Sequence, residues 1–189
     1  MFMAATRPSR IEGYAIVSAD GMLADLTGEM PSALKIDADQ RFFHGSLARA
    51  NAVVHGRHSH EGGPDAPGRT RIIVTRRIAG VTPHPENPKA VLWNPAGASF
   101  EEAWRALGIP GGFLAVIGGT DIFGMFLDDY DAFHLTRVDH VNLPGGRPVF
   151  PDVPALTPEE VLRRHGLKPR STRVLDPEKD VKVVTWTRS

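Results

Sequence analysis

The stretch AVIGGTDIF, residues 115–123, combines an apolar run, a glycine pair and the beginning of a helix. The apolar run starts at Phe113 and is typical of a buried strand. Because Gly118 and Gly119 lack side chains, a ligand phosphate can approach the backbone N–H groups of the helix N-terminus, where the macrodipole favours negative charge. The pattern is neither a GxGxxG dinucleotide site nor a P-loop with its lysine. A glycine pair that serves only a tight turn is the alternative.

The same alternation of strand and helix extends over most of the chain on either side. Apolar, β-branched runs predict strands at residues 14–17, 52–54, 72–74, 90–93, 113–117, 132–138, 173–175 and 181–186. Helical patterns lie at residues 36–50, 99–107, 120–126 and 157–162. This order predicts an α/β fold in which flanking helices cover a mostly parallel central sheet. Only the turn sequence DPEK (176–179) joins the last two strands, so we expect an antiparallel C-terminal hairpin at the sheet edge.

The composition narrows the class of protein. A chain of 189 residues buries about two-thirds of its unfolded surface around one core, so residues 1–189 are predicted to form a single domain. Lys and Arg total 22, as do Asp and Glu, so the overall charge favours neither nucleic acid nor an anionic membrane as partner. The absence of cysteine excludes disulfides, thiolate metal sites and a cysteine nucleophile. Neither a signal segment nor a membrane span is recognisable, so a cytoplasmic protein is the simplest expectation.

Function is sought in the loops, and the pieces rich in Pro and Gly at 62–68, 80–88 and 142–154 are predicted to be loops. One candidate lies just before the first of them: the stretch VHGRHSHE, residues 54–61, crowds His55, His58, His60 and Glu61 together. Their spacing suits neither one face of a strand nor one turn of a helix, so a metal site is not the favoured interpretation. Polar loop histidines are one alternative. The other is an anion site centred on Arg57, where a buried strand gives way to a loop or a helix start.

A further candidate lies in the helical segment MPSALKIDADQRFFHGSL, residues 30–47. Asp39 precedes Phe43 by four residues and therefore shares the helix face that also carries Ile36 and Leu47. Desolvation on an apolar face raises a carboxyl pKa, and such an acid suits recognition of an amidine-like heterocycle edge. The alternative is that Asp37 or Asp39 merely starts or caps the helix.

Together these motifs resemble the dihydrofolate reductase family. The resemblance runs from about residue 12 to 152 and rests on six ordered motifs: MP…D…F, GRHSHE, PGRTRIIVTR, VIGGTDIFGMFL, HLTRV and VFPDV. It implies the family fold, a mostly parallel sheet of eight strands with flanking helices and an antiparallel C-terminal strand. That fold agrees with the independent interpretation above.

The resemblance implies roles for four residues at the substrate. Asp39 matches the family acid that binds the 2-amino group and ring nitrogen of the pteridine, and Phe43 matches the aromatic residue that packs on the substrate. Thr136 matches the threonine that hydrogen-bonds to the acid. Arg69 matches the arginine that holds the α-carboxylate of the folate glutamate tail, a task suited to a bidentate guanidinium.

The resemblance also implies an NADPH site. Arg57, with His58 and Ser59, matches a segment at a helix N-terminus that grips the pyrophosphate and 2′-phosphate. Thr75 and Arg76 match further contacts to the adenosine phosphate. The loop under the nicotinamide and diphosphate matches Gly118, Gly119 and Thr120, and the expected cofactor contacts also include Ala15, Asp121 and Ile122. The implied reaction is hydride transfer from NADPH to an imine carbon of a dihydropterin, and the expected partner is that small molecule, bound to a monomer or homodimer.

Several departures from the family pattern bear on the substrate. Ser32 stands after Pro31 where the family usually has tryptophan, Ala24 replaces a usual glycine, and Gln40 follows the acid at a usually apolar position. Segments 17–25 and 43–57 are also similar to the reductase of riboflavin biosynthesis, which has the same fold and NADPH chemistry but reduces a ribosylaminopyrimidine phosphate. Dihydrofolate reduction is the preferred interpretation because Arg69 and Thr136 both have a purpose there. A binding protein that has lost turnover is the third alternative.

Overall fold

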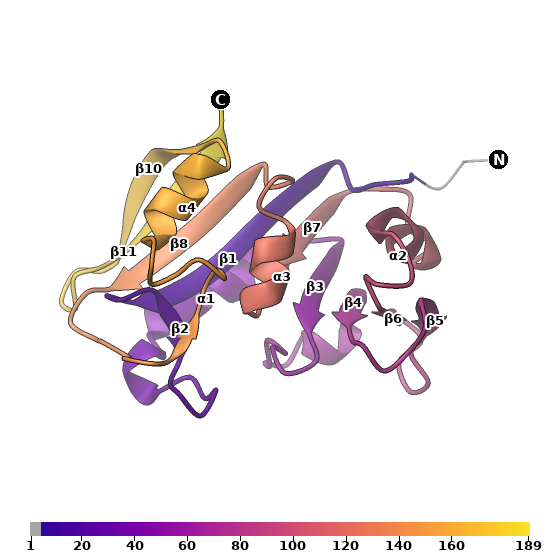
Figure 1. The fold of residues 1–189 in the computed structure, drawn as a ribbon, viewed down its shortest axis with the longest axis horizontal. Coiled ribbons are helices and arrows are strands. Elements are labelled where there is room, and N and C mark those ends of the chain that lie inside the picture. Colours follow the sequence, from indigo (N-terminus) through magenta and orange to yellow (C-terminus); the bar gives the residue numbers. More distant parts are fainter. Residues whose placement is uncertain (1–4) are drawn as a thin grey trace.

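A nine-stranded sheet of order β10-β11-β8-β1-β7-β3-β4-β6-β5 forms the centre of the computed structural model, which describes residues 5–189 (Figure 1). Six neighbouring strands run parallel: β8 (Ala132–Val138), β1 (Arg10–Ser18), β7 (Phe113–Val116), β3 (Ala52–Gly56), β4 (Arg71–Val74) and β6 (Ala90–Trp93). Their apolar and β-branched residues suit strands that are covered on both faces. The predicted α/β fold with a mostly parallel sheet is confirmed.

Antiparallel strands complete both edges of this sheet. β11 (Val181–Arg188) pairs with β8, and β10 (Leu167–Asp176) pairs with β11 to form the outer edge. The predicted C-terminal hairpin is therefore confirmed. At the other edge, β5 (Val81–Pro83) pairs with β6. A separate two-stranded sheet joins β2 (Met22–Ala24) to β9 (Arg147–Pro148).

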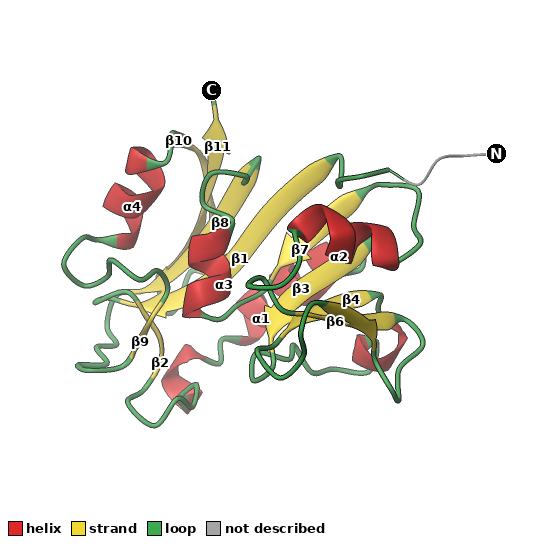
Figure 2. Cartoon of the chain, turned by 45° about the vertical axis from the view of Figure 1, so that its right-hand side comes forward, coloured by secondary structure: helices red, strands yellow, loops and turns green. Residues whose placement is uncertain are grey.

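Helices cover the two faces of the sheet unequally. α1 (Asp37–Leu47) lies on one face, behind the sheet in Figures 1 and 2, and packs its Leu47 with Tyr14, Val53 and Ala115. The other face carries α2 (Phe100–Ala106), α3 (Thr120–Met125) and α4 (Pro158–Arg164). The predicted capping box of α2 is present, and α4 has a second one between Thr157 and Glu160.

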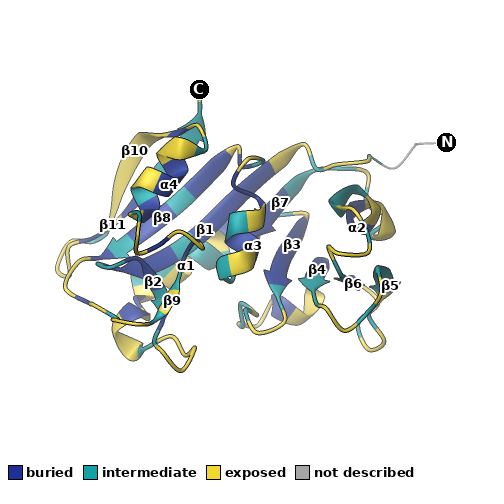
Figure 3. Ribbon diagram, in the orientation of Figure 1, coloured by how far each residue is buried: buried dark blue, intermediate teal, exposed yellow. Residues whose placement is uncertain are grey.

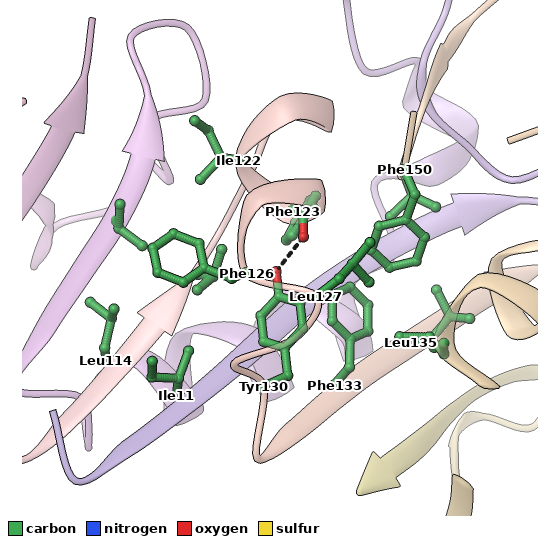
Figure 4. Packing of buried hydrophobic residues seen from close by; sticks show 14 of the residues in the cluster. Ile11, Leu114, Ile122, Phe123, Phe126, Leu127, Tyr130, Phe133, Leu135 and Phe150 are labelled. Carbon is green, nitrogen blue, oxygen red and sulfur yellow. Dashed lines mark hydrogen bonds between the residues drawn. The ribbon is translucent and has the colours of Figure 1, made fainter. Parts of the chain in front are cut away.

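The largest core cluster holds α3 against the sheet (Figure 4). The Phe123 ring packs edge-on to Phe133, with 5.6 Å between ring centroids, and the buried Tyr130 hydroxyl donates to the Phe123 carbonyl oxygen at 3.0 Å. This packing fixes the start of α3, which directly follows the Gly118–Gly119 pair. The core therefore positions the loop that contains Gly118 and Gly119.

Three short strands were not predicted, since β5 lies in the expected loop 80–88, β9 lies in the expected loop 142–154, and β2 was not anticipated at all. β10 also begins six residues before the predicted strand at 173, because its segment Lys168–Arg173 is polar and exposed. Pro169 is tolerated there because β10 is an edge strand. Two 3-10 helices, Ser32–Leu34 and Ala66–Gly68, complete the secondary structure. Among residues 5–189, no helix combines the length and apolar character that a membrane crossing requires.

Candidate functional site

Most of the predicted site residues lie near the carboxyl ends of the parallel strands, whereas Arg69 precedes β4 and lies at the opposite end. β3 ends at Gly56, opposite Val74 at the end of β4, so Arg57 and Thr75 leave neighbouring strands side by side. β7 is the next strand on the other side of β3 and leads directly into Gly118. Loops at this end of a parallel sheet form the ligand crevice in open α/β folds.

Backbone contacts bring the loop after β3 against the glycine pair. The Gly56 N–H donates to the Gly118 carbonyl oxygen at 2.8 Å. A Cβ atom added to Gly119 would lie 3.2 Å from the Ser59 hydroxyl oxygen, and one added to Gly118, whose φ is +119°, would lie 3.2 Å from the Phe123 ring. The pair is joined by a cis peptide bond. Glycine is therefore needed here for close approach as well as for backbone conformation.

Two arginines in the loops at this end of the sheet are free to bind an anion. Arg57 and Arg76 are exposed, and within residues 5–189 neither forms an ion pair with a carboxylate. The Arg57 guanidinium lies 3.1 Å from His58 Nε2. The Thr75 hydroxyl accepts from the Arg77 N–H at 3.2 Å. The predicted anion-binding groups therefore lie at one edge with their positive charge uncompensated.

The helix N-terminus that the resemblance implies at Arg57 is absent, so that expectation was wrong, whereas the loop that the residue pattern also allowed is present. Residues 57 and 58 form a turn, and irregular backbone continues to the 3-10 helix at Ala66. Gly62 and Gly63 adopt φ values of +64° and +86°, and Pro64 follows. Two glycines disfavour a helix, and a proline disfavours helical backbone in the residue before it. An anion bound there would be held by side chains, without the help of a helix dipole.

The histidine-rich stretch is organised around a buried arginine. Arg71 is 1% exposed, and its guanidinium donates to both Glu61 carboxylate oxygens, at 2.9 and 2.7 Å, and contacts His55 Nε2 at 2.8 Å. Burial alone would raise the pKa of Glu61, but the hydrogen bonds from Arg71 outweigh it and lower that pKa. His60 is exposed and accepts from the Gly62 N–H. Within residues 5–189, no group of three or more such side chains converges to hold a metal ion.

Arg69 also faces Glu61. Its Nε lies 3.3 Å from the nearer Glu61 oxygen, and this buried nitrogen makes no hydrogen bond. The side chain is 10% exposed and lines a hollow of about 300 Å³ beside the C-terminal end of α1. The Nε edge of the Arg69 guanidinium is thus directed toward a carboxylate inside the protein, a partner that was not predicted from the sequence.

Asp39 is half-buried at the start of α1, close to Thr136. Burial raises the pKa of Asp39 to about 6, while a hydrogen bond from the Thr136 hydroxyl opposes that rise. Thr136 is 1% exposed and lies on β8 opposite Ile16 of β1. The expected pKa rise is confirmed. Asp37 and Asp39 both lie in the first turn of α1, but its N-cap residue is Ile36 and no side chain caps the helix.

The remaining predicted residues lie near Asp39 or near the glycine pair. Phe43 is half-buried on α1, with its ring centroid 6.3 Å from that of Tyr14. Ala15 lies on β1 two residues beyond Gly13, the last residue that pairs with β7, and so lies level with the glycine pair. The Thr120 hydroxyl donates to the Pro148 carbonyl oxygen. Asp121 is exposed, whereas Ile122 is 5% exposed and belongs to the core.

The chain is similar to known proteins in its sequence and in its fold. The family model described as dihydrofolate reductase matches residues 26–165. No curated protein matches the sequence. Solved structures of similar fold include a riboflavin biosynthesis protein from Shewanella sp. PV-4, with a TM-score of 0.66, 18% identity, and coverage of 95% of this chain and 99% of that one.

Two further structures extend the comparison. Dihydrofolate reductase from Enterococcus faecalis, complexed with NADP(H) and RAB-propyl, has a TM-score of 0.65 at 18% identity and covers 97% of this chain and 98% of its own. A diaminohydroxyphosphoribosylaminopyrimidine deaminase/5-amino-6-(5-phosphoribosylamino)uracil reductase from Thermotoga maritima has a TM-score of 0.62 at 18% identity. It matches 97% of this chain, which spans 57% of that longer protein. At this identity the likeness concerns the fold.

Proposed function

The chain belongs to the dihydrofolate reductase family, and from this premise we propose that it is an NADPH-dependent reductase that converts 7,8-dihydrofolate, or a related dihydropterin, to the tetrahydro form. The observation that carries the proposal is the half-buried Asp39 of α1 beside the buried Thr136 of β8, a strand of the same sheet whose other strands lead into the glycine pair and the free arginines. Each group alone is common in proteins. Their combination at one end of one sheet supports a reductase.

The residues at the carboxyl edge fit NADPH. A side chain at Gly118 or Gly119 would crowd the Phe123 ring or the Ser59 hydroxyl, and Arg57 and Arg76 offer guanidinium groups without a carboxylate partner within residues 5–189. Guanidinium groups bind phosphates through paired, charge-assisted hydrogen bonds. When bound, NADPH supplies the hydride. The chain would hold its phosphates through Arg57, Ser59, Thr75 and Arg76, and its backbone at the glycine pair would take the adjoining part of the cofactor.

The substrate would be oriented by Asp39. As a carboxylate it accepts hydrogen bonds from an amino group and a neighbouring ring N–H, and these two contacts fix a pterin edge in one plane. The Thr136 hydroxyl holds the carboxylate in place. Phe43, four residues further along α1, offers an apolar surface to the ring. Alignment of the two reactants and exclusion of water are what the protein itself contributes.

A ribosylaminopyrimidine phosphate is the second candidate substrate, and two observations favour it. Arg69, the residue expected to hold the glutamate tail of folate, directs its Nε toward the buried Glu61 carboxylate. This partial neutralisation weakens the argument for a tail carboxylate at that place. Ser32 in place of the usual tryptophan points the same way. Both candidates share the cofactor and the hydride chemistry and differ in the substrate alone.

Steady-state NADPH oxidation with each substrate tests the proposal. We expect turnover with dihydrofolate, and we expect Asp39→Asn to reduce kcat/KM at least about tenfold, which corresponds to about 1.4 kcal/mol of transition-state stabilisation. Asp37→Asn is the matched control, because it removes an exposed carboxylate from the same helical turn. Turnover with the ribosylaminopyrimidine phosphate alone would establish the second candidate. Ligand binding without turnover of either substrate would indicate a binding protein.

A further inference from the structure

A hollow of about 430 Å³ lies between α1 and the edge strand β10. Its α1 side is a stripe of residues at helical spacing, namely Ala38, Arg41, Phe42, Gly45 and Ser46, and it continues to Arg49 just after the helix. Its β10 side is Arg173, Val174 and Leu175. None of the proposed substrate or cofactor residues lines it. Asp39 and Phe43 each follow a residue of this stripe by one position, so their side chains lie about 100° around the helix axis from it.

Three arginines give this hollow its charge. Arg41, Arg49 and Arg173 are all exposed, and within residues 5–189 none of them forms an ion pair. No acidic residue lines the hollow. Three guanidinium groups around one opening repel one another unless an anion lies between them. The chain as a whole has no net charge, so this concentration is local.

An aromatic ring and apolar side chains form the rest of the surface. The Arg173 guanidinium carbon lies 5.9 Å from the centroid of the Phe42 ring. That ring is supported from below by Tyr14 and His134, at centroid distances of 6.2 and 5.8 Å. Val174 is 51% exposed beside it. An aromatic face next to guanidinium groups suits a planar ring attached to an anion.

The carboxylate of Glu12 lies behind these rings and is already engaged. Glu12 accepts from the Tyr14 hydroxyl at 2.6 Å, lies 2.9 Å from His134 Nε2, and also pairs with Arg10. Burial alone would raise the pKa of Glu12, but the hydrogen bonds from His134, Tyr14 and Arg10 lower it to about 2. Its negative charge is therefore directed into that network.

β10 is an edge strand of the sheet, and within residues 5–189 its outer side is not paired with another strand. β10 is exposed along residues 168–174, as its colour in Figure 3 shows. Lys168, Arg170 and Arg173 lie along this edge, and like charges on an edge strand oppose its pairing with a second copy. A small ligand is therefore the occupant that the charge favours.

We propose that the hollow between α1 and β10 binds a small molecule that carries a phosphate group and an aromatic or heteroaromatic ring. Arg41, Arg49 and Arg173 would bind the phosphate, and Phe42 would pack against the ring. Arginine suits this task because its planar fork donates two parallel hydrogen bonds to phosphate oxygens. The volume is within the range of small-molecule sites. This site does not depend on the proposed reductase activity.

Heteronuclear NMR of the ¹⁵N-labelled protein in phosphate-free buffer tests the proposal, with adenosine 5′-monophosphate as the probe. We expect saturable shifts at residues 41–49 and 173–175. Adenosine, which lacks the phosphate, should bind at least about tenfold more weakly, because charge-assisted hydrogen bonds are lost. Inorganic phosphate should also bind more weakly than the nucleotide, because it makes no contact with Phe42.

Variants separate this site from the proposed cofactor edge, where the same probe could bind. The double variant Arg41→Gln/Arg173→Gln should weaken the shifts at 41–49 by at least about tenfold. Arg57→Gln and the remote Arg105→Gln should leave them within about twofold, since neither residue lines the hollow. Unchanged spectra outside the hollow would show that each variant is folded. Shifts confined to residues 57–59 and 75–76, or full affinity in the double variant, would overturn the proposal.

Discussion

The proposed function requires Asp39 to be a carboxylate, and this charged form lowers the stability of the folded protein. Burial raises the pKa of Asp39 from its ordinary value of 3.8 to about 6, so the folded protein retains a proton at pH values where the unfolded chain has lost it. Between these two values the folded state binds more protons than the unfolded state. The free energy of unfolding therefore falls as the pH rises from 3.8 to about 6 and stays lower above it.

Replacement of Asp39 by asparagine should remove this pH dependence. We predict that Asp39→Asn is more stable than the natural protein at pH 7.5, and that the difference shrinks as the pH falls toward 4, since the carboxyl group is then neutral in both states. Urea unfolding across this pH range measures it. Asp37→Asn should show no gain at neutral pH, because Asp37 is exposed. Equal stability of Asp39→Asn and the natural protein at all pH values would contradict the burial of a charged group at this position.

Arg57 is the residue through which the proposed site would distinguish NADPH from NADH. Only NADPH carries the 2′-phosphate, so Arg57→Ala should weaken NADPH binding by about 10- to 100-fold and NADH binding much less. Fluorescence titration with both nucleotides provides the comparison. Arg105→Ala, which removes an exposed arginine from α2, is the control and should leave both affinities unchanged. An equal loss for the two nucleotides would mean that Arg57 does not contact that phosphate.

Residue patterns predicted some members of the site and not others. Asp39 stood out because an acid on an apolar helical stripe needs a partner, and its threonine partner came from the family resemblance. Arg71 gave no comparable signal, since an arginine before IIV looks like the polar start of a strand. Its partner Glu61 lies ten residues earlier in an irregular loop. A long-range ion pair of this kind depends on the path of that loop, and side-chain spacing does not reveal such a path.

At the scale of elements, the loop between β3 and β4 is held by the pair of Glu61 and Arg71. Glu61→Ala would leave the guanidinium of Arg71 buried without a counter-charge. We predict a loss of about 3–5 kcal/mol in the free energy of unfolding, measured with urea. Asp128→Ala, which breaks an exposed contact with His165, should cost less than about 1 kcal/mol. A small effect of Glu61→Ala would show that the loop relaxes and hydrates Arg71.

Elements with strong periodicity were predictable, and those defined by tertiary contacts were not. The buried strands and the capped helices follow from apolar runs and capping residues, which act over a few residues. β2 and β9 have three and two residues and exist only because they pair with each other. The helix expected after β3 fails because Gly62, Gly63 and Pro64 disfavour it. In that case local chemistry was a better guide than family resemblance.

At the scale of the whole molecule, one core cluster extends across the sheet. It includes Trp93 on β6 and Trp104 on α2 toward one edge, and Trp186 on β11 toward the other. All three indoles are at most 3% exposed. The proposed single domain requires that these distant parts lose their structure together, because a continuous core couples the elements that share it.

We therefore predict that the chain unfolds as one cooperative unit. Trp186→Phe leaves fluorescence to report from the edge at β6, and the double variant Trp93→Phe/Trp104→Phe leaves it to report from β11. Each substitution removes core contacts and lowers the midpoint, so the comparison is made within each variant, between fluorescence and far-ultraviolet circular dichroism during urea unfolding. The two transitions should coincide in both variants. A fluorescence midpoint well below that of the dichroism in one variant alone would show that its edge of the sheet unfolds separately, and the chain would then consist of two units.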